Sequence, residues 1–221
     1  MLNEPISLFA LWKITPTGYH AVSPEKDRIL ENIQEAFRAA EAEGTRLFNL
    51  FEIHWQTEWE YFAFWETPTF TTLQDAMERL EAAGDFNYAR SKHIIGKKIA
   101  DQFASDLRPA VLDRQSWWGC ATTWRWTPAY YRAGRKELGR LQTRINELHA
   151  RVLEEGGLVF GQYETRFASG WDRFGFSLLP SYRIYQQFIE EFEHAGLYQY
   201  LDARHTAGKA NQAYRFAEHA S

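Results

Sequence analysis

The sequence predicts an α+β protein made of two consecutive copies of one β-α-β-β-α unit. When the chain is compared with itself at an offset of 112 residues, about 26 of the 86 positions from Trp12 to Lys97 carry the same residue, without one insertion. Unrelated segments of ordinary composition match at roughly one position in sixteen. Both copies also show strand and helix periodicity in the same order. We expect the first copy with its linker in residues 1–114 and the second in residues 115–221.

The first copy begins with a mixed aliphatic and aromatic segment that stops at Thr15-Pro16, as a strand does. A helix is predicted between Ser23 and Gly44, because Pro24 suits a first helical turn and glycine commonly follows a last one. The hairpin and second helix come next, where two β-rich segments with hairpin spacing precede an amphipathic stretch. The first strand is predicted over residues 8–14, the two strands of the hairpin over residues 47–55 and 59–65, and the second helix over residues 72–83.

The second copy repeats this order. Its strand, helix, hairpin and second helix are predicted over residues 117–126, 136–155, 158–178 and 182–195. Residues 88–97 and 200–209 share a HxxGK pattern and are predicted to add a further helical piece to each copy. Fourth strands are expected near residues 110–112 and 213–216.

Antiparallel strands with both helices on one sheet face describe a ferredoxin-like domain. In element order and duplication the chain resembles the dimeric α+β barrel superfamily, in which two such sheets, from two chains or a fused pair, close face to face. The resemblance implies that the two units form an α+β barrel. The opening LFALWKITP, with the SPEKDR helix start, also resembles the functionally uncharacterised darcynin family over the first copy only.

The composition limits the classes of partner that the protein is expected to bind. The net charge is -4 and no cluster of Lys and Arg stands out, which argues against binding of nucleic acid. No apolar run approaches the roughly 18 residues of a membrane span, and the N-terminus lacks the pattern of a signal peptide. Cys120 is the only cysteine, which excludes an intramolecular disulfide. These features are typical of a cytoplasmic protein. The resemblance to the α+β barrel superfamily favours a small-molecule ligand, and a fused pair could be a monomer or a homodimer.

The first hairpin strand of each copy supplies candidate catalytic residues. By strict alternation Glu52 and His54 share one face, and Glu164 and Arg166 share the equivalent face with Gln162. Because this face is the more polar one, we expect it to point away from the helices, into a barrel interior. Two carboxylates beside a histidine and an arginine suit general acid–base catalysis. Cross-strand ion pairs on an open sheet face, or salt bridges between the copies, explain the same residues.

His93 and His205 are the only histidines at equivalent positions in both copies. Each could bind a cofactor or form part of a structural helix end. His149 has no counterpart histidine and is expected to be solvated or packed.

Four matched tryptophans are candidates for substrate binding, although strand aromatics also form cores. They are Trp12, Trp124, Trp59 and Trp171.

Three functions remain open. No HExxH, CxxC, GxGxxG, P-loop or GxSxG motif occurs, so the usual support for those chemistries is missing. The superfamily resemblance favours a cofactor-independent monooxygenase, cyclase or isomerase acting on an aromatic or polyketide-like compound. Fused ferredoxin-like pairs also resemble haem enzymes of the chlorite-dismutase and dye-peroxidase types, for which His205 would be the axial ligand. A non-catalytic ligand-binding or scaffold module is the third hypothesis.

Overall fold

The computed structural model describes residues 5–53, 58–99, 117–165 and 170–211. The chain divides into two compact units. The first unit holds the described residues up to Lys97 together with Asn211, and the second holds those from Lys98 to Ala210. Among the described residues, no helix combines the length and the apolar composition that crossing a membrane requires.

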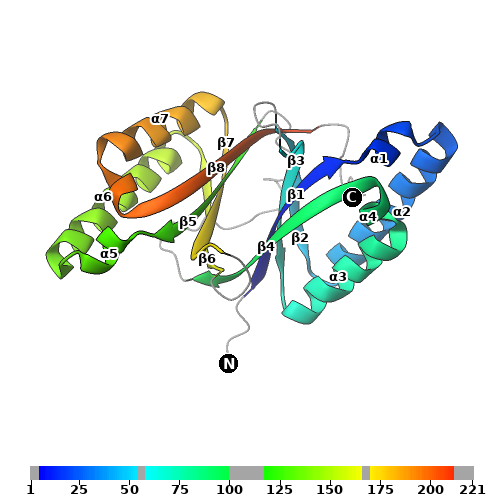
Figure 1. Ribbon diagram of the computed structural model, residues 1–221, viewed down its shortest axis with the longest axis horizontal. Coiled ribbons are helices and arrows are strands. Elements are labelled where there is room, and N and C mark those ends of the chain that lie inside the picture. The colour runs from blue at the N-terminus through cyan, green and yellow to red at the C-terminus, as the bar shows by residue number, and fades with distance from the viewer. Residues whose placement is uncertain (1–4, 54–57, 100–116, 166–169, 212–221) are drawn as a thin grey trace. The chain divides into compact units, whose positions relative to one another are not determined.

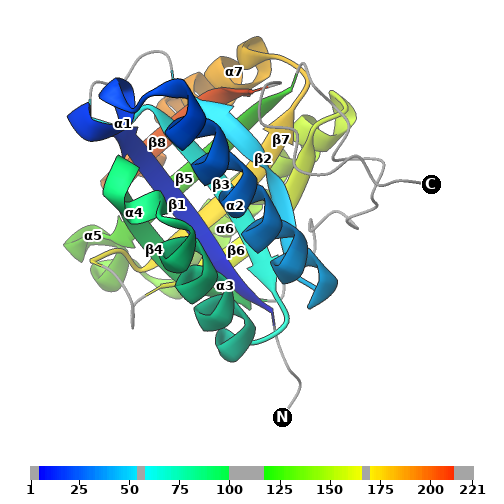
Figure 2. The same cartoon turned by 90° about the vertical axis from the view of Figure 1, so that its right-hand side faces the viewer.

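The first unit is a four-stranded antiparallel sheet with helices on one face, as Figure 2 shows for α2 and α3. β1 pairs with both β3 and β4, and β2 pairs with β3, so the strand order is β4-β1-β3-β2. Its elements are β1 (Ile6–Ile14), α1 (Pro16–His20), α2 (Ser23–Ala42), β2 (Arg46–Glu52), β3 (Tyr61–Thr67), α3 (Phe70–Ala83), α4 (Asp85–Tyr88) and β4 (Ala89–Ile99).

The second unit has the same plan, and Figure 1 shows α6 and α7 together over one face of its strands. β5 pairs with β7 and β8, and β6 pairs with β7. Its elements are β5 (Trp118–Trp126), α5 (Pro128–Arg132), α6 (Arg135–Glu154), β6 (Leu158–Glu164), β7 (Arg173–Leu179), α7 (Tyr182–His194), the 3-10 helix η2 (Leu197–Gln199) and β8 (Leu201–Ala210). The predicted α+β fold class is confirmed.

Residues 112 apart occupy equivalent positions in the two units. Trp12 pairs with Tyr61 across β1 and β3, and Trp124 pairs with Arg173 across β5 and β7. The hairpin registers also shift at the same place, between Leu47 and Leu50 and between Val159 and Gln162. At these β-bulges Asn49 has a φ of 69° and Gly161 a φ of 107°. An extra residue at a bulge breaks the simple alternation of side chains along a strand.

The sheet of the first unit is apolar on both faces. Phe37 of α2 packs edge-on against Trp65 of β3, with ring centroids 5.2 Å apart. The face opposite the helices bears Phe9, Phe51 and Phe62, all at most 2% exposed, and the rings of Phe51 and Phe62 stack at 4.9 Å. The helix-side core consists of Leu8, Ala10, Ala36, Phe37, Leu47, Ala63, Trp65, Leu73 and Leu80.

The prediction of a helical piece at residues 88–97 and 200–209 is wrong. These residues lie mainly in β4 and β8, which pair along the whole of β1 and β5. Gly84 and Gly196, with φ of 94° and 68°, follow the preceding helices, and only the short α4 and η2 intervene before the strands. Pairing with β4 and β8 satisfies backbone groups that the edges of β1 and β5 would otherwise leave open.

The expected strands at residues 110–112 and 213–216 lie outside the described residues. So does the predicted boundary between residues 114 and 115, which stays a prediction.

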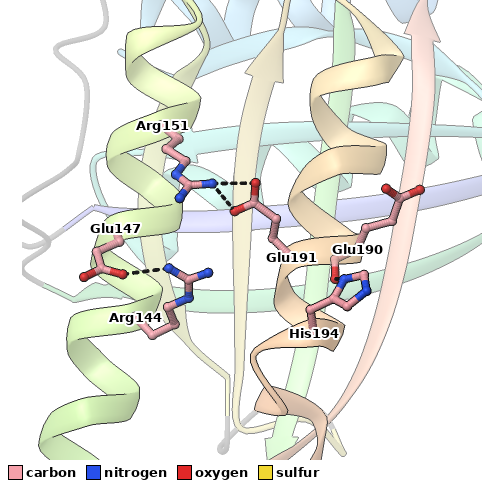
Figure 3. A network of polar contacts seen from close by, with 6 residues as sticks. All are labelled: Arg144, Glu147, Arg151, Glu190, Glu191 and His194. Carbon is pink, nitrogen blue, oxygen red and sulfur yellow. Dashed lines mark hydrogen bonds and ion pairs between the residues drawn. The ribbon is translucent and has the colours of Figure 1, made fainter.

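Ion pairs join the outer surfaces of α6 and α7 (Figure 3). Arg151 donates to both carboxylate oxygens of Glu191 at 2.5 Å, which links the two helices. Within the helices, Arg144 donates to Glu147 at 2.8 Å, and the Nδ1 of His194 donates to the carbonyl of Glu190 at 2.7 Å. Exposed pairs contribute only about 0–1 kcal/mol each, so the buried faces of these helices must supply most of the packing energy.

Candidate functional site

A cavity of about 250 Å³ lies inside the second unit, between helices α6 and α7 and the sheet. Its helix wall is mostly aliphatic and aromatic, and includes Leu141, Ile145, His149, Val152, Tyr185, Phe188 and Phe192. Its sheet wall is more polar, and includes Cys120, Thr122, Trp124, Gln162, Arg173, Ser177 and His205. An apolar pocket with a few converging polar groups is the usual form of a small-molecule site.

Gln162 and Arg173 form a polar pair on the sheet wall. The Nη1 of Arg173 donates to the Oε1 of Gln162 at 3.1 Å. The guanidinium also lies over the ring of Trp126, 5.6 Å from its centroid, which is a cation–π geometry. A guanidinium has five N–H groups, so the pair keeps donors for an oxygen atom of a ligand.

His205 is held in the cavity wall by two hydroxyl groups. Its Nδ1 lies 3.0 Å from the Oγ1 of Thr122, its neighbour across the β5–β8 ladder. Its Nε2 lies 2.8 Å from the hydroxyl of Tyr198 in η2. Because both ring nitrogens are engaged, binding of a metal by His205 would break one of these hydrogen bonds.

The ionisable groups around His205 are held neutral at pH 7. Burial lowers the pKa of His205 to about 4, and raises the pKa of the Cys120 thiol and of the Tyr185 hydroxyl well above their ordinary values. In each case loss of hydration penalises the charged form. Among the described residues, the buried Tyr185 hydroxyl has no hydrogen-bond partner. This part of the wall therefore favours an uncharged surface of a ligand.

His149 projects from α6 into the same cavity. Its imidazole lies parallel to the ring of Phe188 of α7, with centroids 6.0 Å apart and planes 4° apart. The helix wall thus bears an imidazole, and the sheet wall across the cavity bears the Gln162–Arg173 pair. Comparison of the two copies missed His149, because it favours histidines that are present in both.

The equivalent region of the first unit differs from this cavity at several lining positions. The counterparts of His149, Gln162 and Ser177 are Phe37, Leu50 and Trp65. Phe37 and Trp65 fill the space between helices and sheet, and the pocket that remains there measures about 150 Å³ and is lined almost entirely by apolar side chains. Smaller and more polar residues at these positions accompany the larger cavity of the second unit. In the sequence, the cavity could therefore have been located from differences between the two copies and not from identities.

The structure does not bring the predicted carboxylates into either cavity. Glu52 pairs with Tyr61, whose ring lines the helix-side pocket of the first unit, so Glu52 lies on the helix side of the sheet. Glu164 pairs with Arg173 and lies on the helix side of the second sheet. The expectation that both carboxylates point away from the helices is wrong, because that face is occupied by aromatic rings. Neither glutamate is among the described residues that line the two cavities.

The companions predicted for these carboxylates, His54 and Arg166, lie outside the described residues. His93 occupies the strand position equivalent to His205, and burial lowers its pKa. The roles predicted for Glu52 and Glu164 in catalysis, and for His93 in cofactor binding, stay predictions.

The four matched tryptophans separate into two kinds. Trp12 and Trp124 line the pockets of the first and second unit, respectively. Trp59 and Trp171 instead lie beneath the guanidinium groups of Arg90 and Arg125, at 5.7 and 5.9 Å from the ring centroids. Of the four, therefore, only Trp12 and Trp124 are placed to contact a ligand in these pockets.

Burial of His205 makes the stability of the protein depend on pH. Its pKa is about 4 in the folded state and about 6.5 when unfolded, so the unfolded chain takes up a proton first as the pH falls. We expect the free energy of unfolding to fall by about 2 kcal/mol between pH 7.5 and 5 through this group alone. Urea unfolding at both pH values checks this, with His205→Gln as the reference. An equal pH dependence in both proteins would contradict it.

Comparison with solved structures shows the fold. The chlorite dismutase-like protein TA0507 matches with a TM-score of 0.78 and 13% identity, over 97% of each chain. A chlorite dismutase variant from Candidatus Nitrospira defluvii matches with a TM-score of 0.78 and 5% identity, over 98% of this chain and 94% of that one. A haem-binding protein from Thermus thermophilus matches with a TM-score of 0.70 and 13% identity, over 94% and 91%.

These similarities show the ferredoxin-like α+β fold that the sequence predicted. No family model and no curated protein matches the chain, and the resemblance to darcynin-type proteins stays a prediction.

Proposed function

We propose that the second unit binds haem in the cavity beneath α6 and α7 and that the protein is a haem-dependent oxidoreductase. The observation that supports this most is the position of His149, an imidazole on the helix wall facing a polar sheet wall. Haem iron is commonly held by one proximal histidine, while polar groups on the other side of the macrocycle decide its reactivity. The similarity in fold to chlorite dismutases and to a haem-binding protein supports the same proposal.

The side chains that line the cavity have the chemistry needed to hold haem. His149 would hold the haem iron, and aliphatic and aromatic side chains of α6 and α7 would exclude water from the macrocycle. A bound haem supplies redox chemistry at its iron. The amide of Gln162 and the remaining N–H groups of Arg173 would orient and stabilise an oxygen-bearing substrate from the sheet side.

The volume of the cavity supports a second candidate function. At about 250 Å³ the cavity is slightly smaller than the usual ligand pocket, which measures roughly 300–1,000 Å³. Haem must therefore displace side chains of the helix wall, whereas a small aromatic compound fits without rearrangement. This favours the cofactor-independent enzyme as the alternative, acting on an aromatic substrate beside Trp124 and Gln162.

Absorbance spectroscopy distinguishes the two functions. We expect purified protein titrated with haemin to develop a shifted Soret band that saturates at one haem per chain. His93→Ala is the control, because it removes the first-unit counterpart of His205, a half-buried histidine that does not line either cavity, and it should bind haem as the wild type does. A titration without a Soret shift would contradict the haem proposal and leave the small aromatic ligand.

A further inference from the structure

The hydrogen-bonded chain Tyr198–His205–Thr122 has a direction. The ring of Tyr198 is half-buried in η2, the imidazole of His205 lies in β8, and Thr122 lies in β5 where it lines the cavity. A neutral imidazole donates from one nitrogen and accepts at the other. A phenol is a stronger donor than an aliphatic hydroxyl, which favours the arrangement in which Tyr198 donates to Nε2 and the Nδ1–H donates to the Oγ1 of Thr122. The hydroxyl proton of Thr122 then remains available.

The groups around His205 favour a neutral imidazole, which preserves this direction of the hydrogen bonds. Among the described residues, the titratable groups around the ring include Tyr185 of α7, whose ring centroid is 6.1 Å away, Tyr198 of η2 at 6.0 Å, and Cys120 of β5, which lines the same cavity. Burial raises the pKa of all three, so they stay protonated and uncharged at pH 7. Burial also lowers the pKa of His205, so the neutral ring is favoured over the imidazolium form, in which both nitrogens would donate.

The chain of hydroxyls is specific to the unit that has the large cavity. The counterpart of Thr122 in the first unit is Ala10, which pairs with His93 as Thr122 pairs with His205. The counterpart of Tyr198 is Phe86. The histidine is therefore present in both units, but the two positions that supply its hydroxyl partners in the second unit carry alanine and phenylalanine in the first. Within the part of the chain that the structure describes, the Thr122 hydroxyl bonds to His205 alone.

We propose that this chain presents the Thr122 hydroxyl as a fixed hydrogen-bond donor inside the cavity, so that the ligand places a carbonyl or other oxygen acceptor against β5. His205 acts as a positioning residue, because its Nδ1–H occupies a lone pair of Thr122 and turns the hydroxyl proton inward. The inference rests on the cavity being a ligand site, as proposed above, but it does not require that the ligand be haem.

The tautomer of His205 tests the direction of the chain without any ligand. We expect ¹⁵N NMR of the full chain to show a neutral imidazole protonated at Nδ1 at pH 7. In Tyr198→Phe, Nε2 loses its donor and the ring should change to the Nε2–H form, accepting from Thr122. A wild-type ring protonated at Nε2, or an imidazolium at pH 7, would overturn the proposal.

A matched ligand pair tests the donor itself. Acetophenone and α-methylstyrene differ by a carbonyl oxygen in place of a methylene, and both resemble the aromatic guests that apolar protein cavities bind. We expect tryptophan fluorescence titrations to give tighter binding of acetophenone by about two- to tenfold, the range of a neutral hydrogen bond. Thr122→Val should remove this preference and Thr122→Ser should restore it.

Thr123→Val is the control, since Thr123 is the next residue of β5 and is buried on the opposite face of the sheet. It should keep the preference for acetophenone. An unchanged preference in Thr122→Val, or no binding of either compound by the wild type, would overturn the proposal. The haemin titration decides the haem function separately, so the two can fail independently.

Discussion

His149→Ala is expected to lose the haem absorbance shift, whereas His205→Ala keeps it. His149 faces the cavity from α6, while both ring nitrogens of His205 already contact hydroxyl groups. Changes to groups that merely support a metal ligand cost about 10–100-fold in affinity, so loss of the ligand itself should cost at least about a hundredfold. Haemin titrations of both variants, followed at the Soret band, measure this.

Chemical rescue provides the control for His149→Ala. The substitution leaves a space the size of an imidazole, and imidazole added to the buffer should restore the shifted band if the variant is folded. The opposite result, with haem bound by His149→Ala and not by His205→Ala, would assign the axial ligand to His205, as the sequence resemblance predicted.

Ser177→Trp is expected to abolish ligand binding while leaving the protein folded. Trp65 is the residue of the first unit at this position, and its ring occupies the space between helices and sheet against Phe37. An indole at position 177 should fill much of the 250 Å³ cavity in the same way. Inserting a larger side chain into a packed core lowers the free energy of unfolding by about 1–3 kcal/mol. The loss should be smaller here, because the cavity has space for the indole. Haemin affinity should fall by more than about a hundredfold, that is by about 3 kcal/mol.

The matched control is Ser177→Ala, which removes the hydroxyl without filling the space and should bind haemin as the wild type does. Thermal unfolding monitored by circular dichroism verifies that both variants fold. If Ser177→Trp bound haemin with wild-type affinity, the ligand would have to bind outside this cavity.

Much of the fold followed from periodicity and from comparison of the chain with itself. The strands that begin each unit, the long helices and the hairpins lie close to where the pattern placed them, because burial against one sheet face imposes a clear period. The last strands were mistaken for helices. Their HxxGK pattern has no strict alternation, and pairing with β1 and β5 depends on partners at least 75 residues away in sequence.

The site was harder to predict than the fold. Strict alternation placed Glu52 and Glu164 away from the helices, but each strand contains a bulge, at Asn49 and Gly161, that alternation cannot foresee. The search for residues shared by both copies selected His205 and passed over His149. A binding site made by divergence of one copy is found where the copies differ, and the exchange of Phe37 for His149 is the clearest case.

The equivalence of positions 112 apart gives this protein an internal standard. A substitution in the second unit has a counterpart in the first, on the same strand register and in the same molecule. Effects of buffer, concentration or expression reach both members of such a pair equally, so the difference between them isolates what the cavity itself contributes. A measurement on the cavity of the second unit can therefore be expressed relative to the equivalent position of the first.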